Sequence, residues 1–385
     1  MKNDEPKKSI SIVQLSPRLG SGGIERGVVD LAIALKKAGF NSLVISGGGF
    51  LEKELNEHKV THINLPIYSK NPLVFIVNLF RLAKVLKAIQ PDLVHPHSRI
   101  PTWLIYFLQK QLSLRWLSSC NGIHSLDKWG FKKIYNGVLT QGEIIIANSK
   151  FTKEYLVRNY EANPERIRVI YRGIDPEKLN PATVDPDKIQ ALRNLYKISP
   201  DKIVILLPAR FAHWKGQHVF VEACHLLKTQ YKLKFSGLLV GSTKNKNYTA
   251  QVKALIKKYD LDSDLILTGE SQDMKSFYAL SDLIVSTSIE PEAFGRTNVE
   301  AQLMQKPIIA TRHGGACETI IQGESGWLYE PDDAAELART IVEVSHLPKE
   351  SKEKILNKAR QDAINLFSKD KMCNQYIEIY KECLS

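Results

Sequence analysis

The sequence predicts an α/β protein of two domains, each built on a doubly wound parallel β-sheet. The chain has 385 residues, whereas a single hydrophobic core stops growing at roughly 250–300 residues, so two domains are expected. Short β-branched segments alternate with amphipathic helical segments, which is typical of consecutive βαβ units. The alternation restarts after a proline-bearing stretch, which indicates a second sheet of the same kind.

In the first half, amphipathic helical segments separate six predicted strands. A helix is expected at about residues 24–37, and an apolar helix between residues 73 and 89. The expected strands are residues 11–15, 42–45, 62–65, 92–95, 115–119 and 144–147.

The second half repeats this pattern after residues 175–200, which contain four prolines. We place the boundary near Asn180, so that the domains are residues 1–180 and 181–367. The helical tail from residue 334 shows breaks near Pro348 and Ser368, and its end, about residues 368–385, is expected to pack back on the first domain. The expected strands are residues 203–207, 235–240, 265–268, 283–286 and 307–310.

The net charge of +12 is concentrated in the first half of the chain. Residues 1–181 contain 26 Lys or Arg and 15 Asp or Glu, whereas the remainder contains 27 and 26. Such a field attracts anionic partners, and nucleic acid, phosphorylated lipid and a membrane surface all fit it.

Neither the start of the chain nor any apolar run resembles a signal peptide or a membrane span, which needs about 20 apolar residues. We therefore expect a cytoplasmic protein. The five cysteines form no C-x-x-C pair, and reduced core thiols are the simplest interpretation.

Three clusters contain residues suited to binding a phosphorylated ligand. Gly22 and Gly23 follow the first strand and open a helix, where backbone amides can approach a phosphate. Glu25 occupies the position of the third glycine of the dinucleotide fingerprint, which disfavours a nicotinamide or flavin site. Taken alone, the glycines fit a tight turn equally well.

The second cluster follows the first strand of the second domain and contains Arg210 and Lys215. Two cations at the carboxyl end of a parallel strand are suited to clamping a diphosphate, although a solvated basic loop has the same composition.

The third cluster is the segment 288–301, which contains Glu292 and Glu300. Pro291 and Gly295 indicate that Glu292 lies in a loop and that a helix begins near Gly295 or Arg296. The helix end then offers free amides to a phosphate, with a carboxylate on each side of it for sugar and ribose hydroxyls.

No metal site is predicted. His95, His97 and His124 follow strands of the first domain, but a lone histidine is more often structural, and no Glu or Cys follows the His95–His97 pair at ligand spacing. The paired aspartates at 185 and 187, and at 262 and 264, fall in expected turns.

The chain resembles the retaining glycosyltransferases of family four, which have the GT-B fold, and the resemblance covers nearly all of it. The segment from Glu292 to Glu300 matches the family's E-x7-E motif, and residues 306–315 resemble its "KPVVATxxGG" segment. Residues 22–25 resemble its "GGxE", residues 169–175 its "VIPNGID", and residues 210–216 its "GRLxxxKG". Arg172 departs from the usual asparagine, and Ser125 from the usual glycine.

The resemblance implies two Rossmann-like domains that face a central cleft, and a nucleotide-sugar donor, a UDP- or GDP-hexose, bound without metal or cofactor. Arg210 and Lys215 would neutralise its diphosphate, Glu292 would contact the transferred sugar and Glu300 the ribose. His124, where the family has "TxHG", would face the sugar near its reacting carbon. His124 and Glu292 are thus the expected catalytic residues, and the expected donor-binding residues are Gly22, Gly23, Arg210, Lys215, Phe294, Gly295, Arg296, Thr297 and Glu300.

We therefore expect a hexosyltransferase acting on a glycan or lipid-linked acceptor, with synthesis of lipopolysaccharide core or envelope polysaccharide as the leading assignment. The apolar helix at 73–89 fits core packing most simply, but with the basic charge it also fits reversible contact with the anionic inner face of the cell membrane. Two alternatives remain: an epimerase or phosphorylase-like enzyme of the same fold, and a nucleic-acid-binding protein, for which no recognition motif is present.

Overall fold

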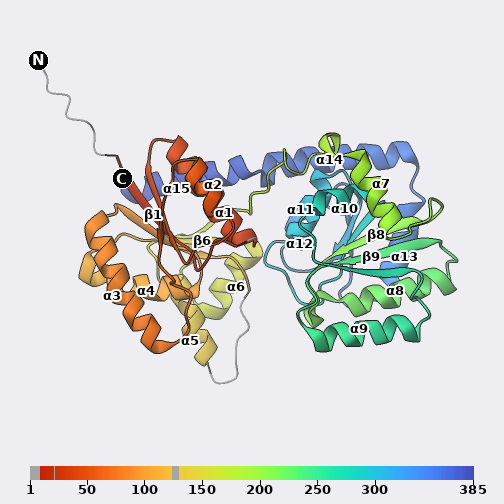
Figure 1. Cartoon of the computed structure of the whole chain (residues 1–385), viewed down its shortest axis with the longest axis horizontal. Coiled ribbons are helices and arrows are strands. Elements are labelled where there is room, and N and C mark those ends of the chain that lie inside the picture. Colours follow the sequence, from red (N-terminus) through yellow and green to blue (C-terminus); the bar gives the residue numbers. More distant parts are fainter. Residues whose placement is uncertain (1–8, 21, 124–129) are drawn as a thin grey trace, which may run out of the picture. The chain divides into compact units, whose positions relative to one another are not determined.

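The computed structural model describes residues 9–20, 22–123 and 130–385. The chain forms two compact units, one of which comprises Met1–Gly173 with Lys369–Ser385 and the other Ile174–Ser368 (Figure 1). The second unit is therefore inserted between two parts of the first. The boundary predicted near Asn180 lies a short distance after Gly173.

The first unit contains a parallel sheet with Rossmann-like strand order. Strands β3-β2-β1-β4 form one ladder and β5-β6-β7 another, and parallel bridges from Val94 to Trp116 and from His97 to Ser119 link β4 to β5. The first six strands have the order 3-2-1-4-5-6 of dinucleotide-binding folds, and β7 adds a seventh strand beside β6. The strands are β1 (Ser11–Leu15), β2 (Asn41–Ser46), β3 (Thr61–Asn64), β4 (Leu93–Pro96), β5 (Ser118–Cys120), β6 (Ile145–Ala147) and β7 (Ile167–Val169).

Helices cover both faces of this sheet because successive residues of a strand point to opposite sides. In β1, Ile12 packs with residues of α1 and α15, whereas Val13 packs with residues of α3 and α4. Tyr376 and Tyr380 of α15 are buried there, so the end of the chain packs on the first unit as expected. The helices are α1 (Gly23–Lys37), α2 (Glu52–Glu57), α3 (Pro72–Ile89), α4 (Arg99–Leu112), α5 (Phe131–Gly137), α6 (Lys150–Tyr160) and α15 (Lys369–Leu384), with 3-10 turns η1 (Val138–Thr140) and η2 (Pro164–Arg166).

The second unit repeats the same strand order in one parallel sheet, β10-β9-β8-β11-β12-β13. The chain order reverses between β8 and β11, which are neighbours at the centre of the sheet. In a doubly wound sheet this reversal point is where ligands bind, beyond the carboxyl ends of the strands. The strands are β8 (Ile203–Pro208), β9 (Phe235–Val240), β10 (Leu265–Gly269), β11 (Leu283–Ser286), β12 (Ile308–Thr311) and β13 (Trp327–Tyr329).

Two apolar clusters on opposite faces hold the helices of the second unit to its sheet. Ile205 and Leu207 of β8 pack with α8, α9 and α13, whereas Val204 and Leu206 pack with α10 and α11. The long helix α14 packs on α11 and therefore belongs to this unit. Of the C-terminal helices, α15 packs on the first unit. The helices are α7 (Pro186–Leu195), α8 (Gln217–Thr229), α9 (Lys246–Lys258), α10 (Met274–Leu280), α11 (Arg296–Leu303), α12 (Ala316–Thr319), α13 (Ala334–Ser345) and α14 (Lys349–Phe367), with 3-10 turns η3 (Pro181–Thr183) and η4 (His213–Lys215).

The second unit begins and ends at adjacent points. The amide of Ile174 donates to the carbonyl of Phe367 at 2.9 Å, and Ile174 forms a parallel bridge with Ser368. The two chain segments that connect the second unit to the first therefore start from adjacent positions in the second unit.

Candidate donor site

Two hydrogen bonds connect the loop after β8 to the loop after β11, at the reversal point of the second sheet. The Thr287 hydroxyl donates to the carbonyl of Lys215 at 2.8 Å, and the amide of Ile289 donates to the carbonyl of Trp214 at 2.8 Å. These bonds position the basic cluster predicted from the sequence at the carboxyl end of β8.

A glycine makes this close approach possible. Gly216 has φ +65°, and a Cβ atom there would lie 1.9 Å from the carbonyl oxygen of Thr287. No side chain fits in that space, and L-residues rarely adopt that backbone conformation.

Lys215 forms an ion pair with Glu292, which follows β11. Its Nζ lies 2.6 Å from Glu292 Oε1, and the two side chains are 15% and 21% exposed. Burial alone would raise the pKa of the Glu292 carboxyl, but Lys215 and the Ser288 hydroxyl together hold that pKa below its usual value. Glu292 is therefore ionised at neutral pH, and Lys215 is held in one position although its charge is partly neutralised.

Arg210 is the second cation of the loop. Its side chain is exposed, and its Cζ lies 5.4 Å from the centroid of the Trp214 ring. The Nζ of Lys215 lies 4.3 Å from the same centroid. Trp214 thus contacts both predicted diphosphate-binding cations, and each gains a cation–π contact from it.

The helix that follows Glu292 begins at Arg296, as predicted. Gly295 caps it with φ +84°, and the buried Phe294 ring packs edge-on against Phe367, at 5.5 Å between centroids. Glu292 therefore precedes the helix, Thr297 lies in its first turn and Glu300 in its second. The free amides of the first turn are suited to an anion.

Glu300 accepts two hydrogen bonds from the protein. Arg296 Nε donates to its Oε1 at 2.6 Å, and the Tyr278 hydroxyl donates to its Oε2 at 2.8 Å. Burial and the adjacent carboxylate keep the pKa of Tyr278 well above its usual value, so the phenol stays protonated. Tyr278 was not among the predicted site residues, because a tyrosine within an apolar helix gives no sign in the sequence that it contacts a site.

The loop after β12 closes over Glu292. The amide of Gly315 donates to the carbonyl of Glu292 at 2.8 Å, and a Cβ atom on Gly315 would lie 2.4 Å from the Cα of Phe294. The neighbouring His313 is largely buried, and burial lowers the pKa of its imidazole although Glu292 lies nearby. In the sequence this loop was recognisable only by its resemblance to the family's segment, and in the structure it lies against the predicted catalytic carboxylate.

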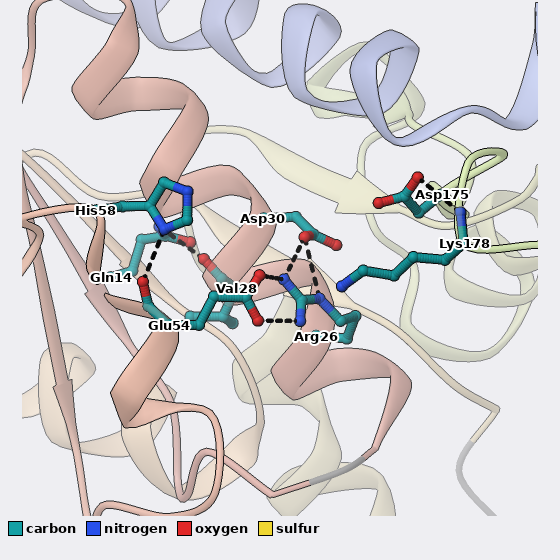
Figure 2. A network of polar contacts seen from close by, with 8 residues as sticks. All are labelled: Gln14, Arg26, Val28, Asp30, Glu54, His58, Asp175 and Lys178. Atoms are coloured by element: carbon teal, nitrogen blue, oxygen red, sulfur yellow. Dashed lines mark hydrogen bonds and ion pairs between the residues drawn. The ribbon is translucent and has the colours of Figure 1, made fainter. Parts of the chain in front are cut away.

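Gly22 and Gly23 belong to the first unit, whereas the other described candidate residues belong to the second. Helix α1 begins at Gly23, whose carbonyl accepts a hydrogen bond from Arg172 Nη1 at 3.0 Å. Figure 2 shows Arg26, in the first turn of α1, between Asp30 and Glu54. Its guanidinium contacts both oxygens of Glu54, at 2.5 and 2.6 Å, which ties α1 to α2.

The other expected catalytic residue, His124, lies outside the described residues. The other two histidines considered for a metal are core residues. His95 bonds the Tyr380 hydroxyl at 2.5 Å and the Ser119 hydroxyl at 2.6 Å, and His97 bonds Gln14 Oε1 at 2.9 Å. Burial lowers the pKa of both imidazoles, so both are neutral.

Among residues 9–20, 22–123 and 130–385, no three His, Cys, Asp or Glu side chains are grouped so as to hold a metal ion. Metal independence stays a prediction. None of the described helices is long and apolar enough to cross a lipid bilayer.

Comparison with known proteins connects both units to sugar transfer. Residues 21–178 match the family model "Glycosyltransferase Family 4", and residues 188–362 match "Glycosyl transferases group 1". The crystal structure of a glycosyltransferase from Rickettsia africae ESF-5 is 37% identical, covers 98% of this chain and 100% of its own, and has a TM-score of 0.88.

Two further likenesses are more distant. Anabaena HepE, solved in complex with UDP and glucose, is 22% identical over 97% of this chain and 100% of its own, with a TM-score of 0.83, and shows the fold alone. The putative colanic acid biosynthesis glycosyltransferase WcaL of Salmonella typhimurium is 26% identical over 211 residues, which span 53% of this chain and 51% of WcaL.

The paired Rossmann-like units thus define an enzyme of the GT-B class. The chain belongs to the group 1, family 4 glycosyl transferases and is a glycosyltransferase, with relatives in polysaccharide biosynthesis.

Proposed function

We propose that this enzyme transfers a hexosyl group from UDP-hexose or GDP-hexose to a glycan or glycolipid acceptor, with retention of anomeric configuration and without a metal ion. The observation that carries the proposal is the position of Lys215 and Arg210. Both lie at the reversal point of the second sheet, and the loop that holds them is fastened to the loop leading to α11. A diphosphate there meets two cations and a helix N-terminus.

The remaining contacts fit the other parts of the donor. Glu292 is ionised beside Lys215, where a diphosphate places the transferred sugar. Phe294, Gly295, Arg296 and Thr297 form the turn that begins α11. Each oxygen of Glu300 accepts one protein hydrogen bond, and because a carboxylate has about four acceptor sites, it can still accept the two ribose hydroxyls.

The leaving group is a nucleoside diphosphate, and fixed positive charge on its oxygens supplies the largest share of catalysis. In the proposed mechanism the acceptor attacks on the face from which the diphosphate departs, and a phosphate oxygen takes the acceptor's proton. His124 is proposed to face the sugar near its reacting carbon.

The polysaccharide assignment rests on the likeness to WcaL, and UDP-hexose as donor is supported by the fold shared with HepE, which binds UDP and glucose. We propose an acceptor of the lipopolysaccharide core or envelope polysaccharide kind at the inner face of the membrane, because the excess positive charge lies in the first half of the sequence.

A screen of UDP-, GDP- and ADP-sugars tests the donor. A cognate donor at 100 times its dissociation constant stabilises the protein by about 2.7 kcal/mol, which thermal unfolding detects. Proton NMR of the product then gives the anomeric configuration, and an inverted product would refute retention. Isomerised donor in the absence of acceptor would instead identify an epimerase.

Glu300→Gln is expected to weaken donor binding by about tenfold or more, because a hydrogen bond to a charged group is worth roughly 1.5–3 kcal/mol. Turnover at saturating donor should change little, since the ribose contact is the same in the transition state. Calorimetric titration with the donor measures the first quantity and steady-state kinetics the second. Glu290→Gln, exposed in the same segment, is the matched control, and equal affinity of the two variants would remove the ribose assignment.

His124→Ala is expected to show the reverse defect: lower turnover with a modest change in donor affinity, because its proposed contact develops at the reacting carbon. The same two measurements separate it from Glu300→Gln. Unchanged turnover in a folded His124→Ala protein would exclude a catalytic role.

A further inference from the structure

Helix α3 exposes large apolar side chains along one face. Leu73, Val77 and Phe80 follow helical spacing and are 74%, 47% and 72% exposed. The residues that α3 buries are Asn78, Leu82 and Leu86. Core packing, the simplest explanation from the sequence, thus accounts for the face with these buried residues but not for the exposed apolar face. Exposed apolar faces of this kind mark interaction sites.

A pocket of about 550 Å³ lies between α3, α4 and α5, which are neighbours in Figure 1. The Phe75 and Phe107 rings meet edge to face at 6.1 Å, and Trp103 stacks on Phe107 at 5.6 Å. The indole N–H of Trp103 donates to the carbonyl of Tyr135 at 3.0 Å, so its polar atom is satisfied. The walls are therefore apolar and suited to a hydrocarbon chain. Its apolar lining residues are Pro72, Phe75, Ile100, Trp103, Phe107 and Tyr135.

The three helices that form the pocket carry an excess of positive charge. Helices α3, α4 and α5 contain three, two and two Lys or Arg residues and no Asp or Glu. Lys70 lines the pocket itself. An apolar pocket that is lined by Lys70 and formed by basic helices fits an amphiphile that has an anionic head and a hydrocarbon tail.

We propose that the α3–α5 pocket binds the hydrocarbon chain of a lipid-linked acceptor, while the exposed side chains of α3 enter the surface of an anionic membrane. This deepens the proposed function and rests on it, because it identifies where the acceptor's lipid is held. On α5, Phe131 and Ile134 are 73% and 70% exposed and extend the apolar surface.

The charge argues for lipid over a second copy of the chain. Two copies meeting through α3 would bury Arg81, Lys84 and Lys87 of both copies against a helix that has no Asp or Glu, and unpaired charges at an interface are costly. An anionic membrane neutralises them, at about 1 kcal/mol for each basic residue near the surface.

Co-sedimentation with vesicles tests the surface. The full-length protein should bind vesicles of equal parts phosphatidylcholine and phosphatidylglycerol, and the double variant Leu73→Asp, Phe80→Asp should bind them at least about tenfold more weakly. Both side chains are exposed, so folding should be unaffected. Leu195→Asp is the matched control, because Leu195 is 68% exposed in the second unit. Equal binding of the double variant and this control would overturn the proposal.

Trp103 reports on the pocket directly. Vesicles of the same composition with brominated acyl chains should quench the tryptophan fluorescence of the wild-type protein, and Trp103→Phe should lose most of that quenching. Quenching that is absent, or unchanged in Trp103→Phe, would show that no chain enters the pocket.

A dimer that the Leu73→Asp, Phe80→Asp variant abolishes while vesicle binding persists would assign the exposed face of α3 to a second copy of the chain.

Donor binding separates this inference from the proposed function. The double variant should bind UDP or GDP, measured by calorimetry, with the affinity of the wild type. If the wild type binds neither nucleotide and releases none from any sugar donor, the proposed function fails. The vesicle and quenching results would still decide whether the pocket takes a lipid chain.

Discussion

Lys215→Ala is expected to lower turnover about a hundredfold, the largest catalytic effect of any variant considered. A positioned charge in a partly closed site is worth roughly 3 kcal/mol in the transition state. Lys215 has such a position, because Glu292 and the Trp214 ring hold its ammonium group. Release of nucleoside diphosphate at saturating donor measures the effect. Arg210→Ala should act in the same direction.

Two comparisons identify the effect as electrostatic. Lys234→Ala removes a lysine that is 74% exposed and should leave turnover unchanged. Glu292→Gln should lower turnover yet tighten binding of the free nucleoside diphosphate, because it leaves the Lys215 charge unneutralised. Added EDTA should have no effect. Two results would refute metal-free binding of the diphosphate by these two cations. One is full activity of a Lys215→Ala, Arg210→Ala double variant, and the other is activity that EDTA abolishes and manganese restores.

Gly216→Ala is expected to destabilise the protein by roughly 2–4 kcal/mol, since it combines backbone strain with a steric clash. The added Cβ would lie 1.9 Å from the Thr287 carbonyl oxygen. The loop after β8 must then move away from the loop after β11, and donor affinity should fall with stability. Thermal unfolding and calorimetry measure the two changes.

Gly269→Ala is the control, because Gly269 also has positive φ, +80°, but nothing lies within 4 Å of its added Cβ. Its cost should be limited to the strain of a left-handed residue, roughly 1 kcal/mol. Equal destabilisation of the two variants would show that the Thr287 contact does not fix the loop.

Much of the fold follows from the sequence because central strands of the two sheets, such as β1, β8 and β9, are buried runs rich in apolar residues. The segment at 235–240 was predicted to the residue, since all six of its residues are buried. The start of α11 at Arg296 was also predictable, because Gly295 adopts a positive φ that ends the loop. The short strands β7 and β13 were both absent from the predicted strands: each has three residues and pairs with one neighbour, so it leaves no periodic pattern.

The site was predictable in outline but not in its contacts. Arg210 and Lys215 were placed at the carboxyl end of a parallel strand, and the family resemblance assigned them and Glu292 to one donor. That Lys215 pairs with Glu292, 77 residues later, depends on how two loops pack, and nothing local encodes it. For α3 the sequence left core packing and membrane contact both open, because buried and exposed apolar residues look alike in a sequence.

The adjacency of Ile174 and Ser368 has a practical consequence for engineering. Because the second unit is one continuous stretch whose ends form a bridge with each other, it can be exchanged as a cassette. A chimaera needs junctions only near 173/174 and 368/369, and each leaves the strands of both sheets intact. The proposed contacts to the diphosphate and the ribose lie in this stretch, so we expect donor choice to move with it, apart from what the recipient's own unit recognises. A related enzyme that accepts the graft should acquire this chain's sugar-nucleotide preference while keeping its own acceptor.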